Sequence, residues 1–211
     1  MAKLTLYHAA PSRSSVTRWM LEEVGEPYDI HFLSLSKGDN RASDYLAVNP
    51  MGKVPALKHG DTVITEAAAI CAYLADEFPQ AGLNIPVGDP RRGTYLKWLF
   101  FGPSCVEPAI TERAFPRQEP PARSTLGFGD FDTVVDVLAK AAAAASPYLL
   151  GNRFTAADVV IGSGLRWGTM FKLLPERAEF KPYMATLAER PALRRATEKD
   201  AALQKAQEAG S

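Results

Sequence analysis

Cysteine and histidine are scarce in this sequence, and neither occurs in a pattern that binds metal or carries redox chemistry. The two cysteines, Cys71 and Cys105, form no CxxC pair, and the three histidines show no metal-ligand spacing. Two isolated cysteines are typical of buried thiols in a cytoplasmic protein, and not of a disulfide framework or a zinc site. We therefore expect no metal and no disulfide chemistry.

An excess of charge and long apolar runs are also lacking. Lys and Arg together number 24, as do Asp and Glu, so the formal net charge is zero. This balance gives no indication of binding to nucleic acid or to an anionic membrane. No uncharged apolar run reaches the roughly 18 residues of a membrane span, and the first residues hold no apolar signal-peptide core. The expected location is therefore the cytoplasm.

The character of the chain changes near residue 80, which predicts two domains within its 211 residues. Before that point, alternating and amphipathic runs follow one another as strand–helix–strand–helix–strand–strand–helix. Residues 81–89 are rich in glycine and proline and are typical of a linker. From residue 90 the apolar spacing is helical. We expect an α/β domain over 1–80 and an all-α domain over 90–211.

The order of the segments also predicts how the strands pair. The first two strands should form a parallel pair joined by a right-handed crossover helix, and the next two an antiparallel hairpin. In the first domain we expect strands at 4–7, 28–33, 54–57 and 63–64, and helices at 16–24, 42–47 and from Glu66. In the second we expect helices at 91–113, 131–146, 159–171, 181–190 and 191–208, with a mobile proline-rich loop at 114–129.

The stretch Asn49-Pro50-Met51-Gly52-Lys53-Val54-Pro55 carries the first functional signal. Pro50 and Gly52 predict a turn. Because Pro55 donates no backbone hydrogen bond and disfavours helical geometry before it, we expect Val54 at a sheet edge or bend, with its N–H and C=O free. An extended peptide can pair with such a backbone as an added strand. A cis bond before Pro55 would also turn this edge into a cleft.

A helix that begins at Glu66 follows the hairpin. The run Glu66-Ala67-Ala68-Ala69 opens an alanine-rich helix with an apolar stripe, and Thr65 can cap it. The unpaired N–H groups of a helix start favour a carboxylate. A peptide-pairing segment and an anion site would then lie side by side. On these residues alone, a hairpin feeding a purely structural helix explains the pattern equally well.

The sequence Thr155-Ala156-Ala157-Asp158 is the clearest local signal in the second domain. Thr155 as N-cap with Asp158 three residues later forms a capping-box pattern, with Asp in place of Glu or Gln. Phe154 and Val159 fit the accompanying hydrophobic staple. The helix that follows is apolar nearly all round, which predicts a central buried helix. We interpret Asp158 as structural and keep a functional role as the alternative.

These three motifs, in this order, resemble the glutathione transferase family over essentially the whole chain. The stretch Tyr95–Phe101, with Glu107-Pro108, is similar to bacterial members. The resemblance implies a thioredoxin-like first domain, glutathione as co-substrate and no metal. It also implies a cytoplasmic detoxification enzyme that forms a homodimer through the Glu66 helix and the 91–113 helix.

The resemblance further implies how glutathione is held. Pro55 would be the cis proline of the fold, and Val54 would pair by its backbone with the cysteinyl part. Glu66 and Ala67 would hold the γ-glutamyl end, and Lys53 or Lys37 could meet the glycyl carboxylate. The family usually has serine where this chain has Ala67. The lost hydroxyl contact predicts glutathione binding weaker by about 1 kcal/mol, while the backbone N–H remains.

The loop after the first strand is where we expect activation of the glutathione thiol. It holds no cysteine, which excludes thioredoxin's own redox chemistry. Lowering a thiol pKa of about 8.5 by two units takes roughly 2.7 kcal/mol, which one hydroxyl hydrogen bond and a helix N-terminus can supply. Serine-type members of the family place that hydroxyl where Ser12 stands, so Ser12 is the predicted catalytic residue. Ser14 is the second choice and Tyr7, placed as in tyrosine-type members, the third.

Structural roles compete with each of these assignments. Helix capping is the alternative for the two serines, and core packing for Tyr7. His8 and Arg13 border the same loop, where we expect ordinary structural or solvent-facing side chains. The electrophile should lie against the 91–113 helix, with an apolar wall and a rim for which core packing is the alternative. The wall and rim residues are Tyr95, Trp98, Phe101 and Arg113, with the proline-rich loop.

The leading predicted function is conjugation of glutathione thiolate to small hydrophobic electrophiles. A module that binds glutathione or a hydrophobic ligand without turnover is the first alternative, and Ala67 favours it slightly. A glutathione-dependent isomerase is the second. A serine-rich loop suits that enzyme group, but the loop here lacks the Ser-Ser-Cys string that we would expect of it.

Overall fold

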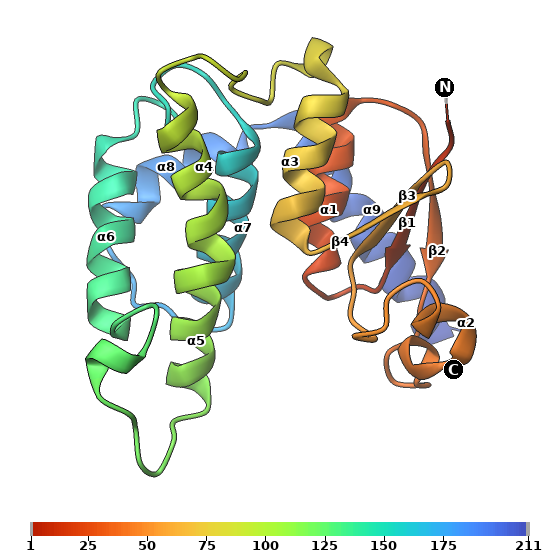
Figure 1. Cartoon of the computed structure of the whole chain (residues 1–211), viewed down its shortest axis with the longest axis horizontal. Coiled ribbons are helices and arrows are strands. Elements are labelled where there is room, and N and C mark those ends of the chain that lie inside the picture. The colour runs from red at the N-terminus through yellow and green to blue at the C-terminus, as the bar shows by residue number, and fades with distance from the viewer. Residues whose placement is uncertain (1, 210–211) are drawn as a thin grey trace. The chain divides into compact units, whose positions relative to one another are not determined.

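The structure is a computed structural model that describes residues 2–209. The chain forms two compact units, coloured along the sequence in Figure 1. One unit comprises the residues up to Ala81 together with those from Arg190 on, and the other is Gly82–Glu189. The first break lies where the composition changes. The segment from Arg190 on, which we expected in the all-α domain, belongs instead to the first unit, because its helix packs there.

A four-stranded mixed sheet forms the centre of the first unit. Its strands are β1 (Leu4–His8), β2 (Tyr28–Phe32), β3 (Ala56–His59) and β4 (Thr62–Thr65), in the order β2-β1-β3-β4. β1 is parallel to β2 and antiparallel to β3, and β3 is antiparallel to β4. The parallel pair, the hairpin and the thioredoxin-like α/β fold are therefore confirmed. We expected Val54 at a sheet edge or a bend. The bend is confirmed, whereas the edge is wrong, because Val54 lies in a bend before β3 and β3 is an interior strand.

Three helices accompany the sheet in the order in which the sequence predicts them. They are α1 (Ser14–Val24), α2 (Ser43–Leu46) and α3 (Ala67–Glu77). Side chains alternate along β1, so Leu4, Leu6 and His8 share one face, and all three are buried. α1 and α3 pack together and contact this sheet (Figure 1). On the opposite face, Tyr7 packs with Tyr45 of α2.

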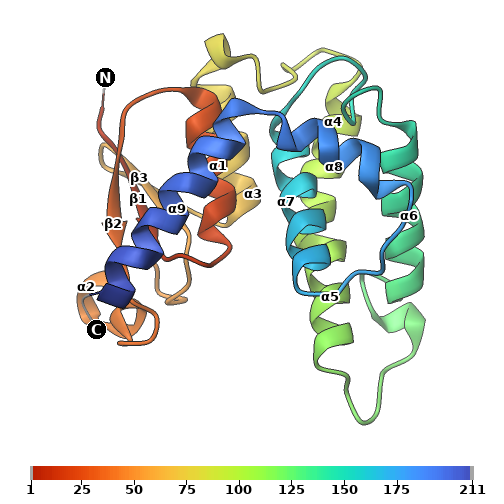
Figure 2. The ribbon, with the colours of Figure 1, turned by 180° about the vertical axis from the view of Figure 1, so that it is seen from behind.

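The last helix, α9 (Pro191–Ala209), returns to the first unit and lies along α1, as Figure 2 shows from behind. It buries a stripe of small and apolar residues, Ala192, Leu193 and Ala196. Ionic contacts flank that stripe on both sides. They join Arg190 to Glu23 at 2.6 Å, Arg195 to Glu22 at 2.9 Å, Lys199 to Glu22, and Asp200 to Arg18 at 2.7 Å. These contacts fix α9 on α1 over most of its length.

The second unit is mostly helical, as expected. Its helices are α4 (Arg92–Phe101), α5 (Glu107–Ala114), α6 (Phe131–Ala144), α7 (Ala156–Met170) and α8 (Phe180–Ala188). A π-helical segment, Gly102–Val106, joins α4 to α5 at the position of Pro103. α7 is largely buried and packs closely on this region. A Cβ atom added at Gly102 would lie 2.6 Å from Val160 Cγ1, so the close approach of the two helices requires glycine there.

The start of α7 carries the predicted capping box. Asp158, fully buried, accepts hydrogen bonds from the Thr155 N–H at 2.9 Å and the Leu149 N–H at 2.9 Å. Tyr183 Oη of α8 donates a third at 3.0 Å, and the Thr155 hydroxyl a fourth at 3.2 Å. Burial raises the pKa of Asp158 above its ordinary value, and these hydrogen bonds oppose the rise. One side chain thus ties a loop and two helices together.

Candidate functional site

Three segments that carry predicted site residues meet at one end of the central sheet. Tyr7 pairs with Ala56, and Ala56 pairs with Thr65. β1 therefore ends, β3 begins and β4 ends at the same level. The loop with Ser12 leaves β1 there, Val54 lies two residues before the start of β3, and Glu66 comes directly after β4. Residues distant in sequence are thereby gathered around one sheet end.

The backbone of Val54 is available to a ligand. Within residues 2–209, neither its N–H nor its C=O takes part in a hydrogen bond. The Val54–Pro55 peptide bond is cis. The preceding Lys53 carbonyl accepts hydrogen bonds from Tyr45 Oη at 2.5 Å and from Asn49 Nδ2 at 2.7 Å. The unpaired N–H and C=O groups of Val54 are thus held at a fixed place near the start of β3.

The turn before Val54 holds this segment in shape. The Gly52 N–H donates to the Asn49 carbonyl at 2.8 Å, and the Met51 N–H to Asn49 Oδ1 at 3.1 Å. Gly52 has φ +60°, and a Cβ atom there would lie 2.8 Å from the Asn40 carbonyl oxygen. Both the backbone conformation and the close contact therefore require glycine at this position.

α3 presents free backbone N–H groups next to Val54. Its N-cap is Glu66, whose side chain is exposed and makes no capping hydrogen bond; Thr65, the expected cap, ends β4 instead. The Ile70 N–H donates to the Glu66 carbonyl at 2.9 Å, so the amides of Ala67, Ala68 and Ala69 precede the first intrahelical bond. Glu66 has φ 65°, which is unfavourable for a residue with a Cβ atom and occurs most often at binding sites.

Ser12 and Ser14 lie in one hydrogen-bonded cluster at the start of α1. Ser12 Oγ is 2.6 Å from Ser14 Oγ and 2.6 Å from the Ala9 carbonyl oxygen, and it accepts the Ser14 N–H at 3.1 Å. Ser14 Oγ accepts the Ala9 N–H at 3.1 Å and lies 3.0 Å from the Ala9 carbonyl oxygen. Ser12 retains 9% of its surface, whereas Ser14 has none. Of the two serines, only Ser12 retains exposed surface.

The cluster continues inward to a buried histidine and a carboxylate. Ser14 Oγ is 2.7 Å from His8 Nδ1, and His8 Nε2 is 3.1 Å from Asp200 Oδ1 of α9, an ion-pair distance without the alignment of a hydrogen bond. Ser15 Oγ and Arg18 also donate to Asp200, at 2.5 and 2.7 Å. Burial raises the pKa of Asp200, but the contacts with His8, Ser15 and Arg18 outweigh it, so the net pKa lies below its ordinary value.

The remaining predicted site residues of the first unit have simpler surroundings. The Tyr7 ring lies against His31 and Tyr45, with centroids 4.8 and 5.5 Å away, on the sheet face opposite His8. The side chains of Lys53 and Lys37 are exposed. Tyr7 is thus separated by the sheet from the serine cluster.

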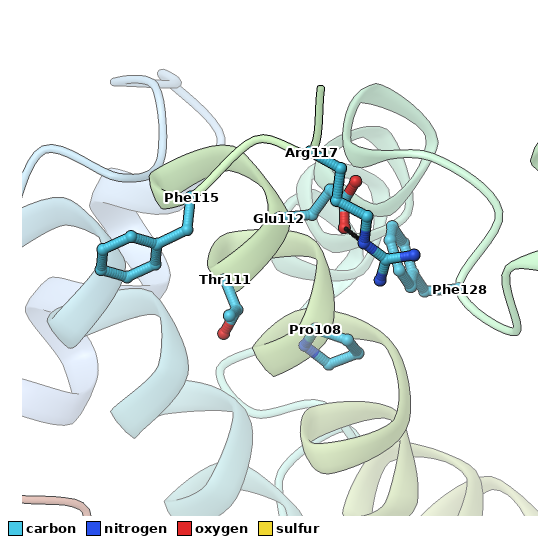
Figure 3. A pocket seen from close by; sticks show the side chains of 6 residues that line it. All are labelled: Pro108, Thr111, Glu112, Phe115, Arg117 and Phe128. Atoms are coloured by element: carbon cyan, nitrogen blue, oxygen red, sulfur yellow. Dashed lines mark ion pairs between the residues drawn. The ribbon is translucent and has the colours of Figure 1, made fainter. Parts of the chain in front are cut away.

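The second unit holds the residues expected to line a site for the electrophile. Tyr95 and Trp98 are buried, and Trp98 packs edge to face on Phe101 with centroids 5.5 Å apart. A hollow of about 370 Å³ lies at α5 and the proline-rich loop that follows it (Figure 3). An ion pair of Arg117 with Glu112, at 3.2 Å, crosses it. Its lining residues are Pro108, Thr111, Glu112, Phe115, Arg117 and Phe128.

The two cysteines have no place in this site. Cys71 is completely buried, and burial raises the pKa of its thiol to about 12. Burial also raises the pKa of the Cys105 thiol. Over residues 2–209, no group of three or more His, Cys, Asp or Glu side chains is placed to hold a metal ion. None of the helices in that range is long and apolar enough to cross a membrane.

Sequence reasoning missed Asp200 as a partner of the serine loop. A usable signal was present, because Ala192, Ala196 and Asp200 recur at four-residue spacing on one face of a helix. A carboxylate in line with buried small residues indicates a charged group that faces the core. The pattern could not indicate which part of the chain would meet it.

Comparison with known proteins identifies the family. Residues 2–76 match the glutathione S-transferase N-terminal domain. Over 195 residues the chain is 31% identical to glutathione S-transferase GstA of Escherichia coli O157:H7, an alignment that covers 89% of this chain and 94% of that protein. The chain belongs to the glutathione S-transferase family.

Among solved structures, the chain resembles the glutathione transferase URE2P6 from Phanerochaete chrysosporium in complex with oxidized glutathione. The two share 27% identity with a TM-score of 0.79, over 95% of this chain and 97% of that one. The theta class glutathione S-transferase from Xanthomonas axonopodis pv. citri, with glutathione bound, shares 27% identity with a TM-score of 0.73. That likeness covers 93% of this chain and 97% of the other.

Proposed function

We propose that this chain binds glutathione and transfers its thiolate to small hydrophobic electrophiles. Membership of the glutathione S-transferase family supports the proposal, as do the related structures with bound glutathione or oxidized glutathione. In the proposed complex, Val54 pairs by its backbone with the cysteinyl part beside cis-Pro55. Glu66 and the Ala67 N–H hold the γ-glutamyl end, and Lys53 meets the glycyl carboxylate.

The observation that carries this proposal is the unpaired backbone at one end of the sheet. Val54 offers both a donor and an acceptor to an extended peptide. The first N–H groups of α3, beside it, favour the α-carboxylate of the γ-glutamyl residue. The exposed Glu66 carboxylate is placed to attract the adjacent ammonium group. A tripeptide with charged ends and an extended middle fits this combination of groups.

Ser12 is the proposed catalytic residue of the transfer. Its hydroxyl is the surface end of the serine cluster and lies at the start of α1, where the helix N-terminus also favours negative charge. A hydrogen bond donated to the sulfur would stabilise the thiolate over the thiol. The thiolate then attacks the electrophile. Ser14 and Tyr7 are less suited, because one is fully buried and the other lies on the opposite sheet face.

The decisive experiment is a glutathione titration followed by thiolate absorbance and by calorimetry. We expect saturable binding together with a thiolate signal at neutral pH. Glu66→Ala should weaken binding severalfold, while Glu77→Ala, at the other end of the same helix, should leave it unchanged. Equal affinity in both variants would refute the assignment of Glu66. Binding without a thiolate signal would instead favour the module without turnover, which Ala67 in place of serine also favours.

The quaternary structure and location complete the proposal. We propose a cytoplasmic homodimer that packs through α3 and the helix formed by α4 and α5. Sedimentation velocity of the purified chain tests this assembly, and a monomer at micromolar concentration contradicts it. A panel of electrophiles, with maleyl-type substrates for the isomerase reaction, would establish the substrate class.

A further inference from the structure

The serine cluster and the His8–Asp200 pair form one continuous path, with Ser12 at one end and Asp200 at the other. Successive contacts are 2.6 Å between the two serine oxygens, 2.7 Å from Ser14 Oγ to His8 Nδ1 and 3.1 Å from His8 Nε2 to Asp200 Oδ1. His8 and Ser14 are fully buried, and Asp200 is largely buried. Ser12 retains 9% of its surface and the Asp200 side chain 15%, so both ends of the path border solvent while its middle does not. Helix capping needs only a side chain that accepts hydrogen bonds from the first helical N–H groups. It therefore does not explain why a buried histidine lies between two serine hydroxyls and a carboxylate.

Hydrogen counting shows how the path can be oriented. A hydroxyl donates one hydrogen bond and accepts two. If His8 carries its hydrogen on Nε2, toward Asp200, then Nδ1 accepts the Ser14 hydroxyl hydrogen. Ser14 Oγ then accepts the Ala9 N–H and the Ser12 hydroxyl hydrogen, and Ser12 Oγ accepts the Ser14 N–H. One lone pair of Ser12 Oγ stays free for a donor at the surface.

We propose that this path takes up the proton of the glutathione thiol and stores it on His8. The inference rests on the proposed function. The S–H bond breaks as its proton binds Ser12 Oγ, the Ser12 hydroxyl proton moves to Ser14 Oγ, and the Ser14 hydroxyl proton moves to His8 Nδ1. The sulfur keeps the electron pair as thiolate, and His8 becomes an imidazolium. No proton enters or leaves the complex.

Each donor between the thiol and His8 Nδ1 has an acceptor after the transfer, and His8 Nε2–H faces Asp200 at ion-pair distance. The Ser12 hydroxyl donates to the thiolate, the Ser14 hydroxyl to Ser12 Oγ, and His8 Nδ1–H to Ser14 Oγ. The Ala9 carbonyl, 2.6 and 3.0 Å from the two serine oxygens, competes for either hydroxyl hydrogen. The same contacts thus accommodate the proton in both places, so only hydrogens need to move.

Asp200 stabilises the imidazolium in this scheme. Two charged groups face this end of His8: Asp200 from α9 and Arg18 from α1, which shares the Oδ1 atom at 2.7 Å. β2 meets His8 through the backbone, where the Leu33 N–H donates to the His8 carbonyl. The net lowering of the Asp200 pKa keeps this carboxylate ionised at neutral pH. His8, Ser14 and Asp200 touch no substrate and act through Ser12, so they are positioning residues.

Proton release on glutathione binding tests the proposal. The full chain is mixed with glutathione in weakly buffered solution that contains a pH indicator, and thiolate absorbance is recorded in parallel. We expect a thiolate signal with much less than one proton released per site. One full proton released per thiolate would overturn the inference and leave the proposed function intact. Absence of glutathione binding would overturn both.

Histidine NMR supplies a second, direct readout. The chain has three histidines, so the His8 ¹⁵N signals can be assigned by elimination with His31→Asn and His59→Asn variants. We expect glutathione to convert the His8 imidazole from neutral to cationic. S-methylglutathione, which has no thiol proton, should bind without that change. An unchanged His8 with glutathione bound as thiolate contradicts the relay.

Variants separate the relay from simple packing. Asp200→Asn should raise the pKa of the bound thiol by about one unit, which lowers its ionisation constant about tenfold. Ser14→Ala breaks the path between Ser12 and His8 and should abolish proton retention. Glu22→Gln is the matched control, because Glu22 also joins α1 to α9 but has no contact with the relay. A thiol pKa that is equal in all three variants would refute the role of Asp200 and Ser14.

Discussion

Two buried carboxylates, one in each unit, show how similar groups are used for different purposes. Asp158 is surrounded by neutral donors, two of them backbone N–H groups. Asp200 faces a histidine, an arginine and a serine hydroxyl. Burial dominates at the first, so its pKa is raised, whereas partner contacts dominate at the second, so its pKa is lowered.

The difference indicates which network can take part in chemistry. The Asp158 network is closed, because every partner lies inside the second unit and the side chain is fully buried. The Asp200 network is open, because it runs through His8 and Ser14 to Ser12, and both Ser12 and the Asp200 side chain retain some exposed surface. A closed network fixes backbone geometry, and an open one can also transmit a proton.

The largest expected effect is the loss of the closed network. Asp158→Ala leaves the N–H groups of Leu149 and Thr155 and the Tyr183 hydroxyl without an acceptor. We expect the free energy of unfolding to fall by about 3–5 kcal/mol. Chemical denaturation measures this loss. Asp158→Asn, which keeps an acceptor oxygen, should lose less; an equal loss in both variants would contradict the hydrogen-bond explanation.

The open network should respond in activity instead. Ser12→Ala removes the surface hydroxyl, and we expect turnover to fall by about ten- to a thousandfold, with glutathione affinity nearly unchanged. Steady-state kinetics with a conjugation substrate and a binding titration measure the two effects. Unchanged turnover would move the catalytic role to Ser14 or Tyr7.

A smaller effect is expected from the ion pairs of Glu22, which join α1 to α9 beside the buried apolar contacts. Glu22→Gln weakens contacts with Arg195 and Lys199, whose side chains are about half exposed. We expect a loss of about 1 kcal/mol in unfolding free energy, because such pairs are largely screened by solvent. Activity should not change. A loss as large as that in Asp158→Ala would erase the contrast between the two kinds of network.

The smallest effect is a difference in the pH dependence of stability. The lowered pKa of Asp200 means that the unfolded chain binds more protons just below the ordinary value of 3.8, so its stabilisation is lost as pH falls through that region. The raised pKa of Asp158 works in the opposite sense, because the folded state takes up the proton first as pH falls toward 3.8.

Thermal unfolding between about pH 3 and pH 6 compares the two groups. Asp200→Asn should flatten the loss of stability at the acidic end. Asp158→Asn should instead remove a gain on acidification and make the net decline steeper. Curves of the same shape in both variants would show that the two carboxylates do not differ as described.

Most of the fold follows from local sequence patterns. Alternation in Leu4–Tyr7 and the capping box at Thr155 each act over a few residues, so the strands and helices could be predicted. The position of Val54 was harder. A proline in an extended run favours an edge, yet β3 is interior, because the ladder begins only after Pro55. The Val54 backbone is unpaired because it lies just outside the strand ladder, and local propensity does not predict where a ladder begins.

The candidate site shows the same limit more clearly. The resemblance led to Ser12, Val54 and Glu66, and sheet register places their segments at one end of the sheet. No local rule could connect His8 with Asp200, since periodicity shows that a side chain is buried but not what it meets. Likewise, the assignment of 190–211 to the helical domain followed continuity of sequence, whereas buried surface and ion pairs place α9 on α1.

The return of α9 to the first unit has a consequence for synthesis on the ribosome. The N-terminal strands emerge early, but the carboxylate that faces His8 follows only after the whole helical unit has been translated. Until then, the face of α1 that meets Ala192 and Ala196 has no cover, and His8 lacks its ionic partner. The first unit, whose strands are synthesised first, thus becomes complete only after α9 has been synthesised.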